Sequence, residues 1–269
     1  MPRFAANLSL MYAELPFLDR IGAAAADGFA AVECQFPYDH TAADIAQRLS
    51  DHGVVQVLIN APPGDFAEGD RGLGGQLGRE AEFRQGIETS LAYAHALRCP
   101  RVHVMLGYQQ PGVTRERQLD LCQRNLAWAA PLAASAGVDL LLEPLNPRDM
   151  PGYLISRQQD AHDIVMQVGA PNLKVQMDLY HCQITEGDLA ARLRHWLPTG
   201  KVGHLQIAGA PERHEPDIGE IHHPYLFDLI DSLGWAGWIG AEYRPRGATS
   251  AGLGWFQPYR HSPAAKATP

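Results

Sequence analysis

The sequence has no apolar run long enough to cross a lipid bilayer, and its four cysteines include no closely spaced pair. Because zinc knuckles and redox dithiols need such pairs, we interpret Cys34, Cys99, Cys122 and Cys182 as reduced and semi-buried. The N-terminal segment lacks a sustained apolar stretch followed by a small-residue cleavage site, so no signal peptide is expected. We therefore predict a cytoplasmic protein with no membrane partner.

Positive charge is also scarce, with 22 Lys and Arg against 30 Asp and Glu and a net charge of −8. Nucleic-acid-binding surfaces are basic, so this balance predicts no nucleic-acid partner. A glycine fingerprint for phosphate binding is missing as well. The cluster GLGGQLG at 72–78 comes about ten residues after the preceding apolar run, too late for a phosphate cradle. We expect no nucleotide cofactor and interpret the cluster as part of a mobile loop.

Eight short apolar or β-rich runs alternate with helical patterns along the chain. They predict strands at 4–9, 30–36, 54–61, 101–107, 139–145, 173–179, 202–208 and 238–243. A chain of 269 residues that is 46% apolar can form one large core. Eight βα units in about 250 residues match an α/β fold of the (β/α)₈ or TIM-barrel type. We predict one barrel domain over residues 1–260 and a flexible tail at 261–269.

An open, doubly wound sheet is the alternative architecture. Such sheets usually have fewer strands and carry a glycine fingerprint in the first strand-to-helix turn, where this chain has NLSLMYAELP. The predicted helices also carry apolar residues at helical spacing, which we interpret as facing the core. These residues are Phe83, Ile87, Leu91 and Leu97 in one helix, Leu119, Cys122, Leu126 and Leu132 in the next, and Tyr225, Leu229 and Leu233 in the last.

Oxygen-bearing side chains stand near the ends of the last four predicted strands. They are Glu143, Asp178, Gln206 and Glu242. The carboxyl ends of barrel strands form the active-site mouth, and adjacent strands lie ~4.8 Å apart, so these groups can converge. Three carboxylates so close would repel one another unless a cation lay among them. The oxygen-rich set suits Mg²⁺ or Mn²⁺ and would leave two octahedral positions for neighbouring substrate oxygens.

Each acid also has a simpler interpretation. A buried carboxylate at a strand end often caps the following helix or forms half of an ion pair. A carboxylate network without metal, paired by Arg213, Arg244 and His181, is therefore the alternative to a metal centre.

Several segments together make the sequence similar to a known family. They are FAANLSLMYAELPFLDR, VECQFPYD, PPGDFAEGDRGL, LLLEPLN, LKVQMDLYH and GHLQIAGAPERHEPDIGEI. With their spacing they resemble the hydroxypyruvate isomerase family of the xylose-isomerase-like barrel superfamily, from residue 3 to about residue 260. The resemblance implies that hydroxypyruvate and 2-hydroxy-3-oxopropanoate (tartronate semialdehyde) are interconverted through an enediolate in glyoxylate metabolism. It also implies a divalent metal, Mg²⁺ first and Mn²⁺ or Co²⁺ next.

The resemblance assigns roles to the residues at the strand ends. The family's two acid/base glutamates fall on Glu143 and Glu242, and the superfamily's four metal positions fall on Glu143, Asp178, Gln206 and Glu242. Many relatives place histidine where Gln206 stands. This departure should weaken the affinity for softer ions such as zinc.

Substrate-binding roles follow from the resemblance and from the chemistry of the substrate. Arg213 matches a position where relatives place a substrate-binding arginine, and Arg71 is a second candidate for the substrate carboxylate. Either arginine could instead be a solvated surface residue. We expect His181 to hydrogen-bond the reacting oxygen and His204 to be a hydrogen-bonded core histidine. The loop 61–78 with Phe66 has the features of a lid, although an ordered surface loop fits as well.

Three other functions compete with this one. An isomerase or epimerase for 2-oxo-tetronate or another small sugar acid would use the same site. A phosphodiesterase like endonuclease IV would need a histidine-rich multi-zinc cluster and a basic face, which this acidic chain does not suggest. A barrel that binds a sugar acid without catalysis is the third. The expected partner is a small oxo acid, and the sequence is also compatible with a homo-oligomer.

Overall fold

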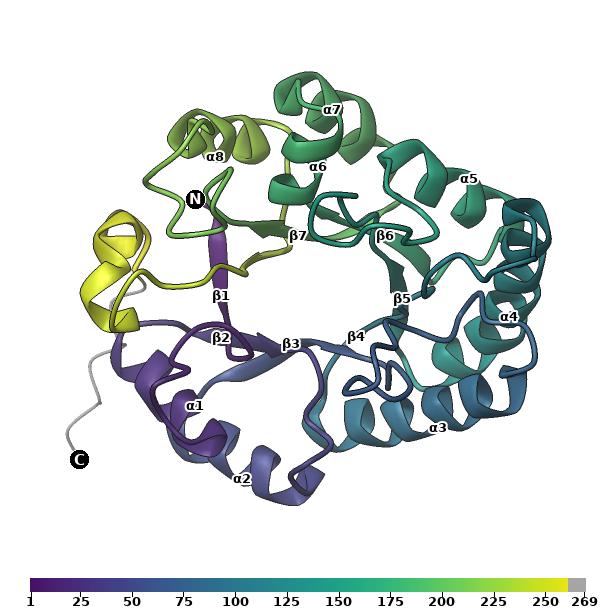
Figure 1. The fold of residues 1–269 in the computed structure, drawn as a ribbon. Helices are drawn as coiled ribbons and strands as arrows, with labels where there is room; N and C mark the ends of the chain where they lie inside the picture. Colours follow the sequence, from purple (N-terminus) through teal and green to yellow (C-terminus); the bar gives the residue numbers. More distant parts are fainter. Residues whose placement is uncertain (261–269) are drawn as a thin grey trace.

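A closed barrel of eight parallel strands forms the centre of the molecule (Figure 1). The computed structural model describes residues 1–260. The strands are β1 (Arg3–Asn7), β2 (Ala31–Cys34), β3 (Val55–Asn60), β4 (Arg101–His103), β5 (Asp139–Leu142), β6 (Leu173–Asp178), β7 (Val202–Ile207) and β8 (Trp238–Ala241). Each pairs with the next in chain order, and β8 closes on β1.

Helices surround this barrel on the outside, as Figure 1 shows. They are α1 (Phe17–Ala26), α2 (Ala42–His52), α3 (Glu80–Leu97), α4 (Arg115–Ser135), α5 (Gln158–Val168), α6 (Leu179–Thr185), α7 (Leu189–Trp196) and α8 (His223–Ser232), with 3-10 segments η1 (Leu197–Thr199) and η2 (Thr249–Tyr259). The single-domain TIM barrel is therefore confirmed, and the doubly wound alternative is wrong. The predicted tail at 261–269 lies outside the described residues.

Each predicted strand segment overlaps an observed strand, β1 begins one residue before its predicted start, and all eight observed strands end earlier than predicted. β5 ends at Leu142, so Glu143 is the first residue beyond the strand. The apolar residues before it are fully buried, because a parallel strand in a barrel is covered by helices outside and packed side chains inside. Among the described residues, no helix is both long enough and apolar enough to span a membrane.

The predicted apolar stripes are mostly buried, with two exceptions. Leu132 in α4 is 41% exposed and Tyr225 in α8 is 47% exposed, so their assignment to the core was wrong. The buried face of α4 continues from Leu126 through alanines at positions 129, 130 and 133, the helical spacing of three, four and seven residues. Leu132 lies off that face. Tyr225 instead receives a hydrogen bond from Arg194 on α7 at 3.1 Å.

The interior of the barrel is polar as well as apolar. Fully buried polar side chains include Asn7, Glu33, Gln56, Gln176, His204 and Gln206. The prediction for His204 is confirmed: its side chain is 0% exposed, and its Nε2 lies 2.7 Å from Glu33 Oε2. Because buried polar groups are costly without partners, these hydrogen bonds fix the side chains beneath the mouth of the barrel.

Candidate active site

Strands β5 to β8 bring four oxygen-bearing side chains to one end of the barrel. Glu143 and Glu242 directly follow β5 and β8, Asp178 is the last residue of β6, and Gln206 lies in β7. Asp178 pairs with Gln206, and Gln206 pairs with Gly240, so these strands reach the mouth in register. All four side chains are buried. All four thus lie at one end of the barrel, but among the acids and histidines of residues 1–260 the group close enough to share one ion holds Glu143 and Asp178 and not Glu242.

A cavity of about 460 Å³ opens above these strand ends. Its lining includes both glutamates, His181 and Arg213, together with Phe66 and Arg71 from the loop after β3. This volume is typical of small-molecule sites. The predicted catalytic and substrate-binding residues thus line one cavity, while Asp178 and Gln206 lie buried beneath it.

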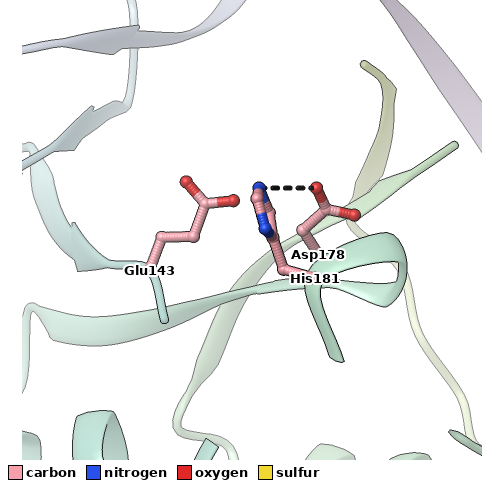
Figure 2. Close-up of side chains that lie close together, drawn as sticks. All are labelled: Glu143, Asp178 and His181. Atoms are coloured by element: carbon pink, nitrogen blue, oxygen red, sulfur yellow. Dashed lines mark ion pairs between the residues drawn. The ribbon is translucent and has the colours of Figure 1, made fainter. Parts of the chain in front are cut away.

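Three buried side chains at the cavity could hold a cation. Glu143, Asp178 and His181 each offer a ligand atom, and these atoms all lie within 4.8 Å of one another. Figure 2 shows the His181 ring between the two carboxylates, with its Nε2 facing Asp178. Within residues 1–260, Glu143 Oε1 and Asp178 Oδ2 are buried without a hydrogen-bond partner. Orphaned carboxylate oxygens fit a hard divalent ion, which would supply the missing partner.

The hydrogen bonds of His181 define its tautomer. The backbone N–H of Asn146 donates to Nδ1 at 3.1 Å, so Nδ1 is an acceptor. Burial lowers the pKa of His181 well below its usual value and keeps the ring neutral. The proton of a neutral ring must then reside on Nε2, which lies 3.7 Å from Asp178 Oδ2. Nε2 is therefore a donor at the cavity, as expected for a group that contacts a substrate oxygen. This tautomer leaves the ring no lone pair for a cation, so Glu143 and Asp178 are the members of the group that can serve as ligands.

Asp178 serves two purposes at once. Its Oδ1 accepts a hydrogen bond from the backbone N–H of Tyr180 at 2.8 Å and so caps α6. Its Oδ2 lies 3.7 Å from His181 Nε2 and 3.8 Å from Arg213 Nη2, two residues that line the cavity. The capping interpretation and the metal interpretation of this acid are thus compatible, because each uses a different oxygen.

Arg213 supplies positive charge to the acid cluster. Its Nη2 donates to Glu242 Oε2 at 2.6 Å and lies 3.8 Å from Asp178 Oδ2. The residue adopts the left-handed conformation at φ 60°, and its guanidinium lies 5.0 Å from the centre of the Tyr180 ring. The ion pair expected in a carboxylate network is therefore present for Arg213. Arg244 differs, because it is exposed at the rim of the cavity.

Burial shifts the protonation equilibria of the three acids. It raises the pKa of Glu143 well above its usual value, with the nearby Glu242 and Asp178 adding to the effect. Burial raises the pKa of Asp178 to about 7, although Arg213 opposes the shift. Burial also raises the pKa of Glu242 against the pull of Arg213. A carboxylate with a raised pKa can act as a base or an acid near neutral pH.

The sequence analysis missed His103. This residue ends β4, lines the cavity, and places Nδ1 3.6 Å from Glu143 Oε2. Neither ring nitrogen has a hydrogen-bond partner within residues 1–260. Burial, and then the neighbouring His204, lower the pKa of His103 to about 3. The sequence analysis predicted that the fourth strand runs to residue 107, whereas β4 ends at His103, so a search of the predicted strand ends would not have found this residue.

The loop after β3 has an exposed part, which could act as a lid, and a buried part, which is packed against the barrel. Residues 72–75 are buried, and the N–H groups of Gly74 and Gly75 donate to the carbonyls of Met105 and Leu106 at 3.1 and 2.9 Å. A Cβ at Gly72 would lie 2.3 Å from the Met105 carbonyl, so these glycines allow close backbone packing. The interpretation of this cluster as mobile was therefore wrong.

The exposed part of the same loop carries Phe66 and Arg71. The Arg71 guanidinium lies 3.7 Å from the centre of the Phe66 ring, which is 5.4 Å from that of Phe36. Arg71 also donates from Nη1 to the carbonyls of Phe66 and Asp70. This arrangement places an aromatic ring and a guanidinium at the rim of the cavity.

Comparison with known proteins places the barrel among described families. Residues 21–259 match the model of the xylose isomerase-like TIM barrel family. The chain is 56% identical to the 2-oxo-tetronate isomerase of Cupriavidus necator, over 96% of this chain and 99% of that protein. It is 40% identical to the hydroxypyruvate isomerase of Escherichia coli, over 97% of this chain and 100% of the relative.

A solved structure has the same fold as this chain. The crystal structure described as AP endonuclease, family 2, from Brucella melitensis superposes with a TM-score of 0.94 at 49% identity. It covers 97% of this chain and 100% of the other.

We expect the affinity for Mn²⁺ to fall as the pH falls through 7. Below its pKa of about 7, Asp178 is protonated, and a metal must displace that proton. Lowering the pH from 8 to 6 should therefore weaken binding about ten-fold for one displaced proton. The free Mn²⁺ signal in electron paramagnetic resonance titrations measures this. An affinity that stays constant over that range would show that no such proton is displaced.

Proposed function

The chain belongs to the xylose isomerase-like TIM barrel family and is an isomerase, and on this premise we propose that it moves the carbonyl of a short 3-hydroxy-2-oxo acid. The observation that carries the proposal is the pair of buried glutamates, Glu143 and Glu242, that line one cavity from different strands. Moving a carbonyl from C2 to C3 requires one proton to leave C3 and one to reach C2. Two carboxylates with raised pKa values are suited to these transfers.

In this proposal Glu143 takes the proton from C3. Glu242, on the opposite side of the substrate, is the second acid/base group for the proton that reaches C2. The product of proton removal is an enediolate. Its return to a carbonyl at C3 needs a proton at C2 and the transfer of the hydroxyl proton from the C3 oxygen to the C2 oxygen. Both glutamates are buried, and Glu242 is fixed by hydrogen bonds to Oε1 from Asn7 and Gln35, each at 3.1 Å. A fixed carboxylate needs little reorganisation during the transfer.

The proposed ligands of the divalent ion are Glu143, Asp178, Gln206 and Glu242. Mg²⁺ is the preferred ion in this proposal, and Mn²⁺ or Co²⁺ are the alternatives. When bound, this ion would act as a Lewis acid for negative charge on the two substrate oxygens. The orphaned oxygens of Glu143 and Asp178 support this use of the site.

The remaining cavity residues bind and orient the substrate. His181 donates from Nε2 to the reacting oxygen, consistent with the tautomer set by Asn146. Arg213 is proposed to bind the substrate carboxylate, because its guanidinium lines the cavity and already faces carboxylates. Arg71 at the rim is the second candidate for this contact.

The four-carbon acid 2-oxo-tetronate is the proposed substrate. The relative named for it shares 56% of its residues with this chain, against 40% for the relative named for hydroxypyruvate. A cavity of about 460 Å³ also has room for the additional hydroxymethyl group. Hydroxypyruvate, with 2-hydroxy-3-oxopropanoate as product, is the second candidate, because the same proton transfers apply. A cytoplasmic location and a role in glyoxylate metabolism stay predictions.

A substrate comparison tests this choice. We expect kcat/KM for 2-oxo-tetronate to exceed that for hydroxypyruvate by about ten-fold or more, because the extra hydroxyl can hydrogen-bond in the cavity. Product formation from both acids, measured with the same metal-loaded enzyme, gives the two values. The reverse preference would assign the three-carbon substrate and leave the proton-transfer chemistry in place. No turnover of either acid would refute the proposed function.

Replacement of the two glutamates tests the acid/base roles. Glu143→Gln and Glu242→Gln should each lower kcat by about 10² to 10⁴-fold, since an amide cannot exchange the proton. Glu186→Gln is the matched control: its side chain is also buried, but it contacts Arg192 and the backbone of Gln158. The control should keep wild-type kcat. Substantial turnover by both site variants, with native melting temperatures, would remove the two glutamates from the mechanism.

A further inference from the structure

A fourth buried acid, Glu33, lies inside the barrel on β2 and is 0% exposed. Its Oε1 accepts hydrogen bonds from Asn7 Nδ2 at 3.0 Å and Gln206 Nε2 at 2.7 Å. Its Oε2 lies 2.7 Å from His204 Nε2, so this oxygen and the ring nitrogen share one hydrogen bond. Glu33 therefore joins donors from β1 and β7 at the floor of the site.

The barrel has a space shaped for this carboxylate. Gly240 on β8 faces it, and a Cβ at this position would lie 2.4 Å from each of the two Glu33 carboxylate oxygens. Any larger residue would force the carboxylate out of its present position. The glycine thus permits Glu33 to reach its three donors.

The consequence for Gln206 is a fixed amide orientation. An amide side chain has a donor end and an acceptor end, and Glu33 Oε1 is an acceptor for two amide N–H groups. Gln206 must therefore turn Nε2 toward Glu33, which leaves Oε1 on the side of β6, where it accepts from Gln176 Nε2 at 2.6 Å. Asp178 also stands on β6. The oxygen, which is the end able to bind a cation, thus lies on the side of β6, the strand that ends with Asp178.

A second connection leads from Glu33 to Glu242. Asn7 Nδ2 lies 3.0 Å from Glu33 Oε1 and 3.1 Å from Glu242 Oε1, so a single amide group bridges the two acids. The other end of this amide accepts from the backbone N–H of Ser9 at 3.1 Å, which fixes its orientation. Glu33 is thereby linked to two of the four proposed metal ligands.

We propose that Glu33 is a positioning residue that presents the carbonyl oxygen of Gln206, and through Asn7 the carboxylate of Glu242, to the divalent ion. This inference rests on the proposed function, because it assigns a role relative to the proposed metal site. Glu33 does not line the cavity, so it acts through its neighbours and not on the substrate. Residues that orient metal ligands in this way strongly affect metal affinity.

The test is the affinity for Mn²⁺ alone, measured by electron paramagnetic resonance. Glu33→Gln keeps the size of the side chain but adds an amide N–H₂ among three donors, so Gln206 is no longer held in one orientation. We expect binding about 10 to 100-fold weaker than in the wild type. Gln56→Leu is the control, since Gln56 is equally buried but bonds to the carbonyl of Leu58. It should bind Mn²⁺ like the wild type.

A double variant separates positioning from a general loss of structure. If Glu33 acts largely through Gln206, Glu33→Gln should weaken Mn²⁺ binding much less in a Gln206→Ala background than in the wild type. Equal losses in both backgrounds would overturn the route through Gln206. Gly240→Ala provides a second route if Glu33→Gln does not fold, because its Cβ displaces the Glu33 carboxylate while all polar groups remain. It should also weaken binding.

The possible failures can be told apart. Folded Glu33→Gln and Gly240→Ala variants with wild-type affinity would overturn the role of Glu33 while leaving the metal site intact. A wild-type protein that does not bind Mn²⁺ would overturn both the metal site and the positioning role.

Discussion

The burial of several carboxylates at one end of a barrel is the constraint on which the site depends. Glu143, Asp178 and Glu242 are all at most 5% exposed, and their negative charges would repel one another in a medium of low dielectric constant. The Arg213 guanidinium offsets part of this negative charge, because it pairs with Glu242 and lies near Asp178. Because one oxygen on each of Glu143 and Asp178 has no hydrogen-bond partner within the described part of the chain, the cluster retains the capacity for a further cation.

The same constraint explains why the barrel interior beneath the cavity is hydrogen-bonded. Carboxylates that must stay in place need neighbours that cannot rotate. Asn7 bonds to both Glu33 and Glu242, Gln206 bonds to both Glu33 and Gln176, and the backbone N–H of Gln35 donates to Ser9 Oγ. Raised pKa values and fixed positions then arise from a single cause, the exclusion of water. The chemistry of proton transfer near neutral pH follows from this environment more than from the identity of any one residue.

The fold and the place of the site could be predicted from the sequence, because barrel strands alternate with helices and the carboxyl ends of the strands meet at one mouth. Alternating apolar runs and helical patterns defined the eight strands, and polar residues at the run ends defined Glu143, Asp178, Gln206 and Glu242 as neighbours. Side-chain pairing was harder. Nothing in the order of residues indicates that Arg213 pairs with Glu242, or that Glu33, far away along the chain, bonds to Gln206.

The errors have physical causes as well. Glycines at 72–75 suggested mobility, but in the structure they allow the loop backbone to approach Met105 and Leu106 closely. Leu132 was assigned to the core by residue type, although alanines occupy the buried face at that point in α4. His103 was missed because the fourth strand was predicted to run to residue 107, whereas β4 ends at His103 and the cavity extends to it.

Anomalous diffraction from a crystal soaked in Mn²⁺ tests the central claim most directly. Our account predicts one strong peak in contact with the oxygens of Glu143, Asp178, Gln206 and Glu242, with the Arg213 guanidinium moved away from Glu242. A map without a peak at these residues, while Arg213 keeps its present ion pair with Glu242, would contradict the account.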